Sequence, residues 1–252
     1  MGLVHFSDNA LGTISMSWNR RPSSPAVRSG RRGPGLTTRG VEVVAELNAR
    51  GMLIDLAYAD RATTLAVCER TTMPVISSHT GARALQDFPH YLDDDEIRAI
   101  ADTGGLVGLW PFRSRGQGIA DLDDFARHAD HLARIAGPAQ VCVGTDMNGV
   151  PGLMAGYRGE PDFPVLTAAL RRAGFSHAEV AGIISGNMTR VVSRAAADCM
   201  MASVRRLQDG LAAWAAPRTA AASLLHGGKQ LPVQLAHFEP LRLGQADRPR
   251  RT

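Results

Sequence analysis

The stretch MPVISSHTG, residues 73–81, is an apolar run that ends on a histidine and a glycine. Three further runs have the same form: GMLIDLAYAD (51–60), GGLVGLWPF (104–112) and AQVCVGTDMNG (139–149). Strands that are apolar almost throughout are buried on both faces, as they are in a parallel sheet covered by helices. The four runs therefore predict neighbouring strands of one parallel sheet.

The segments between these runs carry helix signals, namely apolar residues at helical spacing, capping pairs at the start and glycines at the end. The signals are Val41, Val44 and Leu47 before Gly51, the pair Asp93 and Glu96, the stripe Phe125, Ala129, Leu132 and Ala136, and the pair Ser176 and Glu179 before a helix through Val192. Strands and helices that alternate in this way predict either a doubly wound sheet or a (β/α) barrel.

Two stretches stand apart from this alternation. Residues 18–35, WNRRPSSPAVRSGRRGPG, are rich in Arg, Ser, Pro and Gly and predict a long exposed loop. Residues 195–252 combine Ala-rich with Pro- and Arg-rich sequence and show little periodicity after Trp214. We therefore expect a barrel-like domain over residues 1–193 and a C-terminal extension over residues 194–252, with at most one helix followed by disorder.

Composition narrows the class of protein. Hydrophobic residues make up 44% and charged residues 21% of the 252, as in soluble globular proteins, and we find neither a membrane-spanning run nor a signal peptide. The net charge of +4 equals the difference between the eight basic and four acidic residues after position 194, and this segment lacks interleaved aromatic residues, so we expect no nucleic-acid partner. Three scattered cysteines indicate no disulfide framework, which predicts a cytoplasmic location.

Residues with useful chemistry stand at the ends of the apolar runs. They are Asp55 and Tyr58, His79, Trp110 and Arg113, and Asp146, with His5 and Asn9 ending the similar segment GLVHFSDN. The carboxyl ends of barrel strands meet at one mouth, so residues distant in sequence come together there. A histidine and an aspartate that meet in this way can bind a divalent metal or serve as general acid and base.

Structural interpretations stay open beside the functional ones. His79 can be a hydrogen-bonded structural residue, and Asp146 can organise a turn with Asn148 and Gly149. His128 and His131 share a helix face beside Leu132, and we expect both histidines to pack against the core rather than to bind a metal.

Six stretches together resemble the membrane (renal-type) dipeptidases, which are zinc enzymes of the metallo-dependent hydrolase class. The stretches are GLTTRGVEVVAELNARGMLIDLAYADRAT, MPVISSHTGARAL, DDDEIRAIADTGGLVGL, HADHLARIAG, VCVGTDMNGV and GNMTRVV, in the family's order and within residues 1–193. The resemblance implies a (β/α)8 TIM barrel, of which we expect about five of the eight strands here, and a site with one or two zinc ions.

The resemblance also assigns roles residue by residue. His79 falls on a zinc-ligand histidine, and Asp146 falls on the aspartate that contacts the catalytic water and the substrate amine. His5 matches a histidine that binds the scissile group of the substrate. Tyr58 takes the place of a second zinc-ligand histidine, and a neutral phenol is a poor zinc ligand. His90 takes the place of the arginine that binds the substrate carboxylate.

The resemblance predicts a metallohydrolase that cleaves dipeptides or similar small amides. The family's first strands carry a His-x-Asp pair and a bridging glutamate. The matching stretches of this chain begin after those strands, so we expect this chain to lack the family's N-terminal third. Three alternatives to an active dipeptidase follow from the missing strands and from the replacement of family site residues by Tyr58 and His90. The chain can be a non-catalytic remnant, a module completed by a partner chain or by a second copy, or a branch of the family with one metal or altered chemistry.

Overall fold

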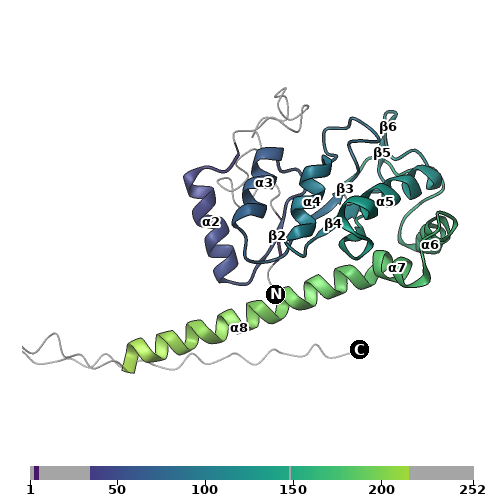
Figure 1. Ribbon diagram of the computed structural model, residues 1–252. Helices are drawn as coiled ribbons and strands as arrows, with labels where there is room; N and C mark the ends of the chain where they lie inside the picture. The colour runs from purple at the N-terminus through teal and green to yellow at the C-terminus, as the bar shows by residue number, and fades with distance from the viewer. Residues whose placement is uncertain (1–2, 6–34, 148, 216–252) are drawn as a thin grey trace, which may run out of the picture. The chain divides into compact units, whose positions relative to one another are not determined.

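The computed structural model describes residues 3–5, 35–147 and 149–215, and within them a five-stranded parallel sheet is the central element (Figure 1). Its strands are β1 (Leu3–His5), β2 (Leu53–Asp55), β3 (Val75–Thr80), β4 (Leu106–Leu109) and β7 (Val141–Val143). Four of them lie inside the apolar runs of the sequence, which confirms the predicted strands. The predicted loop before residue 35 and the end of the C-terminal extension lie outside the described residues.

The order of the strands decides between the two predicted architectures. The order of strands in the sheet is β1-β2-β3-β4-β7. Strands of this sheet that follow one another along the chain are therefore also hydrogen-bonded neighbours, and every pair is parallel. A doubly wound sheet reverses its strand order at a switch point, whereas a (β/α) barrel keeps adding strands on the same side. The chain therefore has the barrel order, with five strands in its described part, as expected.

Helices follow the strands in turn and cover one face of the sheet (Figure 1). They are α2 (Thr38–Ala49), α3 (Arg61–Arg70), α4 (Asp94–Asp102), α5 (Leu122–Ala136), α6 (Phe163–Arg172), α7 (His177–Ala181) and α8 (Asn187–Ala215). A short antiparallel pair, β5 (Arg113–Ser114) and β6 (Gln117–Gly118), lies between β4 and α5. The helices α2, α3, α4 and α5 thus each return the chain to the amino end of the next strand of the sheet, whereas α6, α7 and α8 follow β7.

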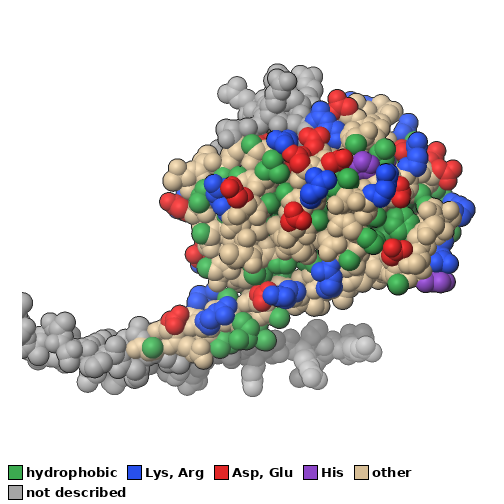
Figure 2. Space-filling view, in the orientation of Figure 1, with side chains coloured by type: hydrophobic (Ala, Val, Ile, Leu, Met, Phe, Trp, Pro, Cys, Tyr) green, Lys and Arg blue, Asp and Glu red, His purple; other side chains and the backbone are tan. Residues whose placement is uncertain are grey.

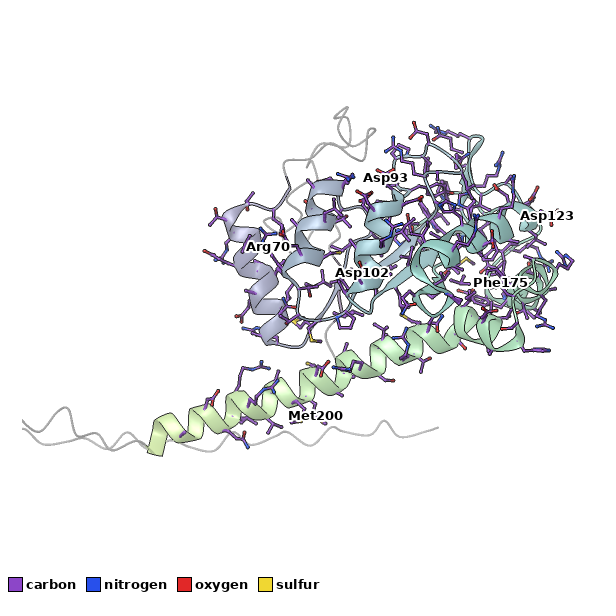
Figure 3. The ribbon with its side chains drawn as sticks, in the orientation of Figure 1. Arg70, Asp93, Asp102, Asp123, Phe175 and Met200 are labelled. Atoms are coloured by element: carbon purple, nitrogen blue, oxygen red, sulfur yellow. The ribbon has the colours of Figure 1, made fainter. Side chains whose placement is uncertain are left out.

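The helix starts follow the predicted capping chemistry. Asp93 and Glu96 form a reciprocal capping box at the start of α4, where Figure 3 shows Asp93, and Ser176 and Glu179 form another at α7. Gly51, with φ of 64°, lets the chain leave α2 in the left-handed conformation. Val41 differs from expectation, because its side chain is 39% exposed while Val44 and Leu47 of the same helix are buried.

The predicted last helix is longer and less regular than its sequence signals indicate. α7 is followed by a π-helical turn over residues 182–186, and α8 then continues past Val192 to Ala215, across the predicted domain boundary. The Asn187 side chain donates to the carbonyls of Pro138 and Val141 and so anchors the start of α8 beside β7. Three alanines at 195–197 favour continuation of the helix.

The two histidines of α5, His128 and His131, lie where sequence analysis predicted them. His128 on α5 is buried, and its Nδ1 accepts a hydrogen bond from the backbone N–H of Ala82 at 3.0 Å. His131 lies one turn further on, with its Nε2 2.7 Å from Asp94. Both histidines therefore pack between α5 and the neighbouring elements, as predicted.

Acidic and basic side chains are intermixed on the helical face of the protein (Figure 2). Several form pairs within one helix, such as Arg50 with Glu46 and Arg134 with Asp130. Exposed pairs of this kind contribute at most about 1 kcal/mol each to stability. None of the helices in the described residues combines the length and apolarity needed to cross a membrane.

The buried His128 predicts a specific loss of stability in acid. Burial lowers the pKa of His128 to about 4, against about 6.5 in an unfolded chain. The folded protein therefore binds fewer protons than the unfolded chain between these values, and its stability falls as the pH drops from 6.5 toward 4. The contribution of one such histidine reaches about 1.4 kcal/mol per pH unit.

Replacement His128→Asn keeps an acceptor for Ala82 but removes the titrating group. Urea denaturation at pH 7 and pH 5 should show a smaller difference in the free energy of unfolding for His128→Asn than for the unchanged protein. His177→Asn, at the exposed start of α7, is the matched control and should keep the original pH dependence. An unchanged pH dependence in His128→Asn would show that His128 is not the group responsible.

Candidate functional site at the carboxyl edge of the sheet

Five side chains from separate parts of the sequence meet where the strands end, and we call them the strand-end cluster. Its members are Tyr58, His79, His90, Trp110 and Asp146. Tyr58 follows β2, His79 lies near the end of β3, Trp110 follows β4 and Asp146 follows β7. The parallel order of these strands explains why residues up to 88 positions apart come into contact.

The carboxylate of Asp55 joins the first two of these strand ends. It is 2% exposed, and its Oδ1 accepts hydrogen bonds from the backbone N–H groups of Ala57 at 3.0 Å and Ser78 at 2.9 Å. One oxygen therefore fixes both the turn that carries Tyr58 and the strand that carries His79. Sequence analysis named Asp55 only as a strand-end residue, and its position directly after a buried strand was the signal for this role.

Tyr58 is aimed at the cluster by an unusual backbone conformation. The N–H of Ala59 donates to the carbonyl of Leu56 at 2.9 Å, and Tyr58 has φ of 67° inside this turn. A left-handed conformation costs about 1–3 kcal/mol for a residue other than glycine, and such residues concentrate at functional sites. Burial, and then the charge of Asp146, raises the pKa of the Tyr58 phenol well above its usual range, so the phenol stays protonated.

His79 is held in a defined orientation by its neighbours. Ser78 Oγ lies 2.9 Å from His79 Nδ1, and the ring packs edge-on against Tyr58 and Trp110, each with ring centroids 4.9 Å away. The opposite ring atom, Nε2, lies 3.8 Å from Asp146 Oδ2. A partner on one imidazole nitrogen that directs the other toward a site is the usual arrangement of a histidine that binds a metal.

Asp146 both forms a turn and directs its carboxylate to the strand-end cluster. Its backbone carbonyl accepts from the N–H of Gly149 at 2.9 Å, so the residue does form a turn, and its φ is 46°. Its carboxylate oxygen Oδ2 accepts a hydrogen bond from the Tyr58 hydroxyl at 3.4 Å and faces His79. Asn148 lies outside the described residues.

His90 joins the cluster through its contact with the ring of Tyr58. Its ring lies edge-on to Tyr58 with centroids 4.7 Å apart, and to Phe88 at 5.3 Å, while its carbonyl accepts from the Thr80 hydroxyl. Burial, reinforced by the nearby His79, lowers the pKa of His90 to about 4. His90 is therefore a neutral imidazole at neutral pH, and does not supply the positive charge of an arginine.

The remaining predicted residues are placed as follows. The backbone of His5 pairs in register with Asp55, so β1 brings it to the same edge of the sheet, but its side chain is not described. Arg113 belongs to the β5–β6 hairpin, where it donates to the carbonyl of Gly118. A His-x-Asp sequence also occurs in this chain at residues 128–130, but it lies within α5 and not at a strand end.

Metal-binding residue types also gather at Asp93, Asp95 and Glu96. These residues already have structural partners. Glu96 accepts from the backbone N–H of Asp93 in the capping box, and Arg61 pairs with both aspartates. The cluster is therefore a capped and neutralised start of α4. Among the described residues, the strand-end cluster remains the candidate site.

The sequence of this chain is similar to those of known dipeptidases. The family model described as membrane dipeptidase (peptidase family M19) matches residues 1–203. Dipeptidase 3 of Macaca fascicularis is 32% identical over 167 residues, covering 64% of this chain and 33% of that protein. Dipeptidase aclJ of Aspergillus oryzae is 32% identical over 178 residues, covering 69% of this chain and 42% of that protein.

A solved structure shows the same similarity in three dimensions. A metallopeptidase from Rhodobacter sphaeroides, crystallised with a phosphinate mimic of the dipeptide L-Ala-D-Ala, superimposes with a TM-score of 0.62 at 26% identity. The match covers 66% of this chain and 49% of that protein. The chain thus spans less than half the length of each of these three relatives.

The position of His79 depends on a glycine that sequence analysis did not single out. Gly144 follows β7, and a Cβ placed there would lie 1.7 Å from the Ser78 carbonyl oxygen and 3.2 Å from His79 Cα. Gly144→Ala should therefore displace the strand that carries His79 and lower the free energy of unfolding by about 1–3 kcal/mol. Urea denaturation measures this loss.

Gly210→Ala is the matched control for this substitution. Gly210 lies within α8, and a Cβ there would meet no atom within 4 Å. Alanine at this helical position should stabilise the protein by up to about 1 kcal/mol, the opposite sign from Gly144→Ala. A Gly144→Ala protein as stable as the unchanged one would mean that β3 and β7 are less closely packed than described.

Proposed function

This chain belongs to the membrane dipeptidase family, peptidase family M19, and we propose that it contributes His79 and Asp146 to a zinc site for hydrolysis of dipeptides or similar small amides. The observation that carries this proposal is that His79 Nε2, near the end of β3, lies 3.8 Å from Asp146 Oδ2, just after β7. The two residues lie 67 positions apart in the sequence, so local structure alone does not bring them together.

The donor atoms of this pair fit a divalent metal. Imidazole nitrogen and carboxylate oxygen are both kinds of ligand that zinc takes, so His79 Nε2 and Asp146 Oδ2 would be the atoms that hold an ion. The Tyr58 phenol is a weak third donor because it stays protonated. Among the described residues the pair therefore supplies two good ligands, whereas a catalytic zinc ordinarily has about three from protein.

The residues of the cluster have distinct proposed roles. A zinc ion would supply a polarised water molecule. Ser78 orients His79 for ligation, and the second Asp146 oxygen accepts a hydrogen bond from the water or the substrate amine. His5 is proposed to stabilise the scissile carbonyl from the adjoining strand, and a neutral His90 accepts or donates a single hydrogen bond at the substrate's far end.

Metal analysis and hydrolysis together test this proposal. The full chain, dialysed against zinc and then against buffer, should retain about one equivalent by atomic absorption and release amino acids from a dipeptide such as L-Ala-D-Ala. His79→Ala should lose at least tenfold in zinc affinity, because it removes one of the two strong donors that the described residues supply. His131→Ala, which changes a histidine paired with Asp94 outside the cluster, should retain the metal. Equal zinc binding by both variants would refute the assignment of His79.

A second candidate function follows from the ligand count. Because the described residues offer two strong donors and the sheet ends at β1 and β7, the chain can instead be a module completed by another copy or partner chain, or a non-catalytic remnant. Mass measurement by size-exclusion chromatography with light scattering separates these cases. A folded monomer that binds no zinc and cleaves no dipeptide supports the remnant, whereas zinc binding confined to an oligomer supports completion by a partner.

A further inference from the structure

We propose that two copies of this chain associate through the outer faces of their α8 helices, which lie antiparallel to one another. The contact surface is the α8 stripe, which we define as Met200, Met201, Val204 and Leu207. The inference is independent of the proposed function, because the stripe lies on α8 whereas the strand-end cluster follows the carboxyl ends of the strands.

One side of α8 packs against the amino edge of the sheet. Asn187 donates to the Val141 carbonyl at the start of β7, and Arg206 donates to the Ala49 carbonyl shortly before β2. Ala202, one turn before Arg206, is buried. The strand-end cluster lies at the opposite edge of the sheet. A second copy bound to the other side of α8 therefore leaves these contacts and the candidate site as they are.

The other side of α8 exposes apolar side chains. Of the six large apolar side chains that are exposed in the described residues, four form the α8 stripe, and Met200 and Leu207 are 63% and 69% exposed. The stripe repeats at helical spacing, and the sequence has no charged residue between Asp198 and Arg205. Figure 2 shows apolar side chains along this helix, and Figure 3 labels Met200 on it. A contiguous apolar surface of this kind indicates an interaction site.

The charges beside the stripe favour a second copy of the chain as the partner. Arg194, Asp198, Arg205 and Asp209 are 4, 7 and 4 residues apart, so they share one flank of the helix, and their charges alternate in sign. In an antiparallel pair Arg205 lies opposite Asp198 of the second copy, and Arg194 lies opposite its Asp209. A parallel pair would place like charges together. Asp198 already accepts from Arg194 in its own helix at 3.0 Å, and a carboxylate has room for a second donor.

The apolar residues fit the same antiparallel register. It brings Met200 beside Val204 of the second copy, and the symmetry of the pair repeats this contact, so the two stripes cover one another. An anionic lipid surface fits less well, because helices that bind it carry mainly Lys and Arg on the polar face. The flank of the α8 stripe instead balances two arginines with two aspartates.

The length of the contact sets its expected strength. The helix rises about 24 Å from Arg194 to Asp209, at about 1.5 Å per residue. A single helix pair of this length lies at or below the lower end of standard interfaces, which bury roughly 1,200–2,000 Å². We therefore expect a dissociation constant in the micromolar range.

Sedimentation equilibrium of the full chain, without added metal, tests this inference. The unchanged protein should pass from monomer to dimer between about 1 and 200 µM. Val204→Lys places a charge at the centre of the stripe and should weaken association about tenfold or more. Val41→Lys, on an exposed position of α2, is the matched control and should associate like the unchanged protein. Circular dichroism shows whether the compared proteins are equally folded.

A monomer at every concentration overturns the inference, and so does a Val204→Lys protein that is folded and associates as tightly as the unchanged one. Because neither zinc nor a dipeptide is present in these measurements, either result leaves the proposed function untouched.

Charge reversal tests the antiparallel register. Arg205→Asp brings two acidic residues together across the pair and should weaken association about three- to tenfold. Adding Asp198→Arg restores opposite charges and should recover most of the loss. A double variant that associates no better than Arg205→Asp alone overturns the antiparallel arrangement.

Discussion

The arrangement of the candidate site depends on the buried carboxylate of Asp55. A carboxylate that is 2% exposed must be compensated, because burying an unpaired charge costs several kcal/mol. Here the compensation comes from backbone N–H groups on two different strand ends, those of Ala57 and Ser78. The same two bonds therefore help to compensate the buried carboxylate and also fix the position of Tyr58 relative to His79.

Close backbone packing extends this constraint to the far strands. Gly108 and Gly144 both face the Ser78 carbonyl, at distances that leave no room for a side chain. The segment that carries His79 is thus held by Asp55 on one side and by two glycines on the other. Asp146 follows Gly144 by two residues, so the glycine that admits β3 also brings the carboxylate to His79. Two left-handed residues, Tyr58 and Asp146, are tolerated because their surroundings fix them.

The relation to larger dipeptidases gives this arrangement its functional sense. The described sheet ends at β1 and β7, and a closed barrel of this class has eight strands and no edges. The chain spans less than half the length of the three relatives named above, and the described residues supply two strong metal donors. Fold and family are thus shared with dipeptidases, and the strand ends that meet at this edge are the part of the family's architecture that the described residues contain.

The sequence by itself determined the strands, the alternation with helices, the caps at Asp93 and Ser176, and the identity of the strand-end residues. These features follow from local periodicity and hydrogen bonding, which neighbouring residues encode. Val41 and the length of α8 were not determined in this way, since burial and continuation of a helix depend on what packs beside it. Only the tertiary structure decided that the sheet has barrel order, that Asp55 joins two strands, and that Tyr58 and His79 both face one oxygen of Asp146. Contacts between residues far apart in the chain are set by strand order and side-chain direction, and no local pattern records them.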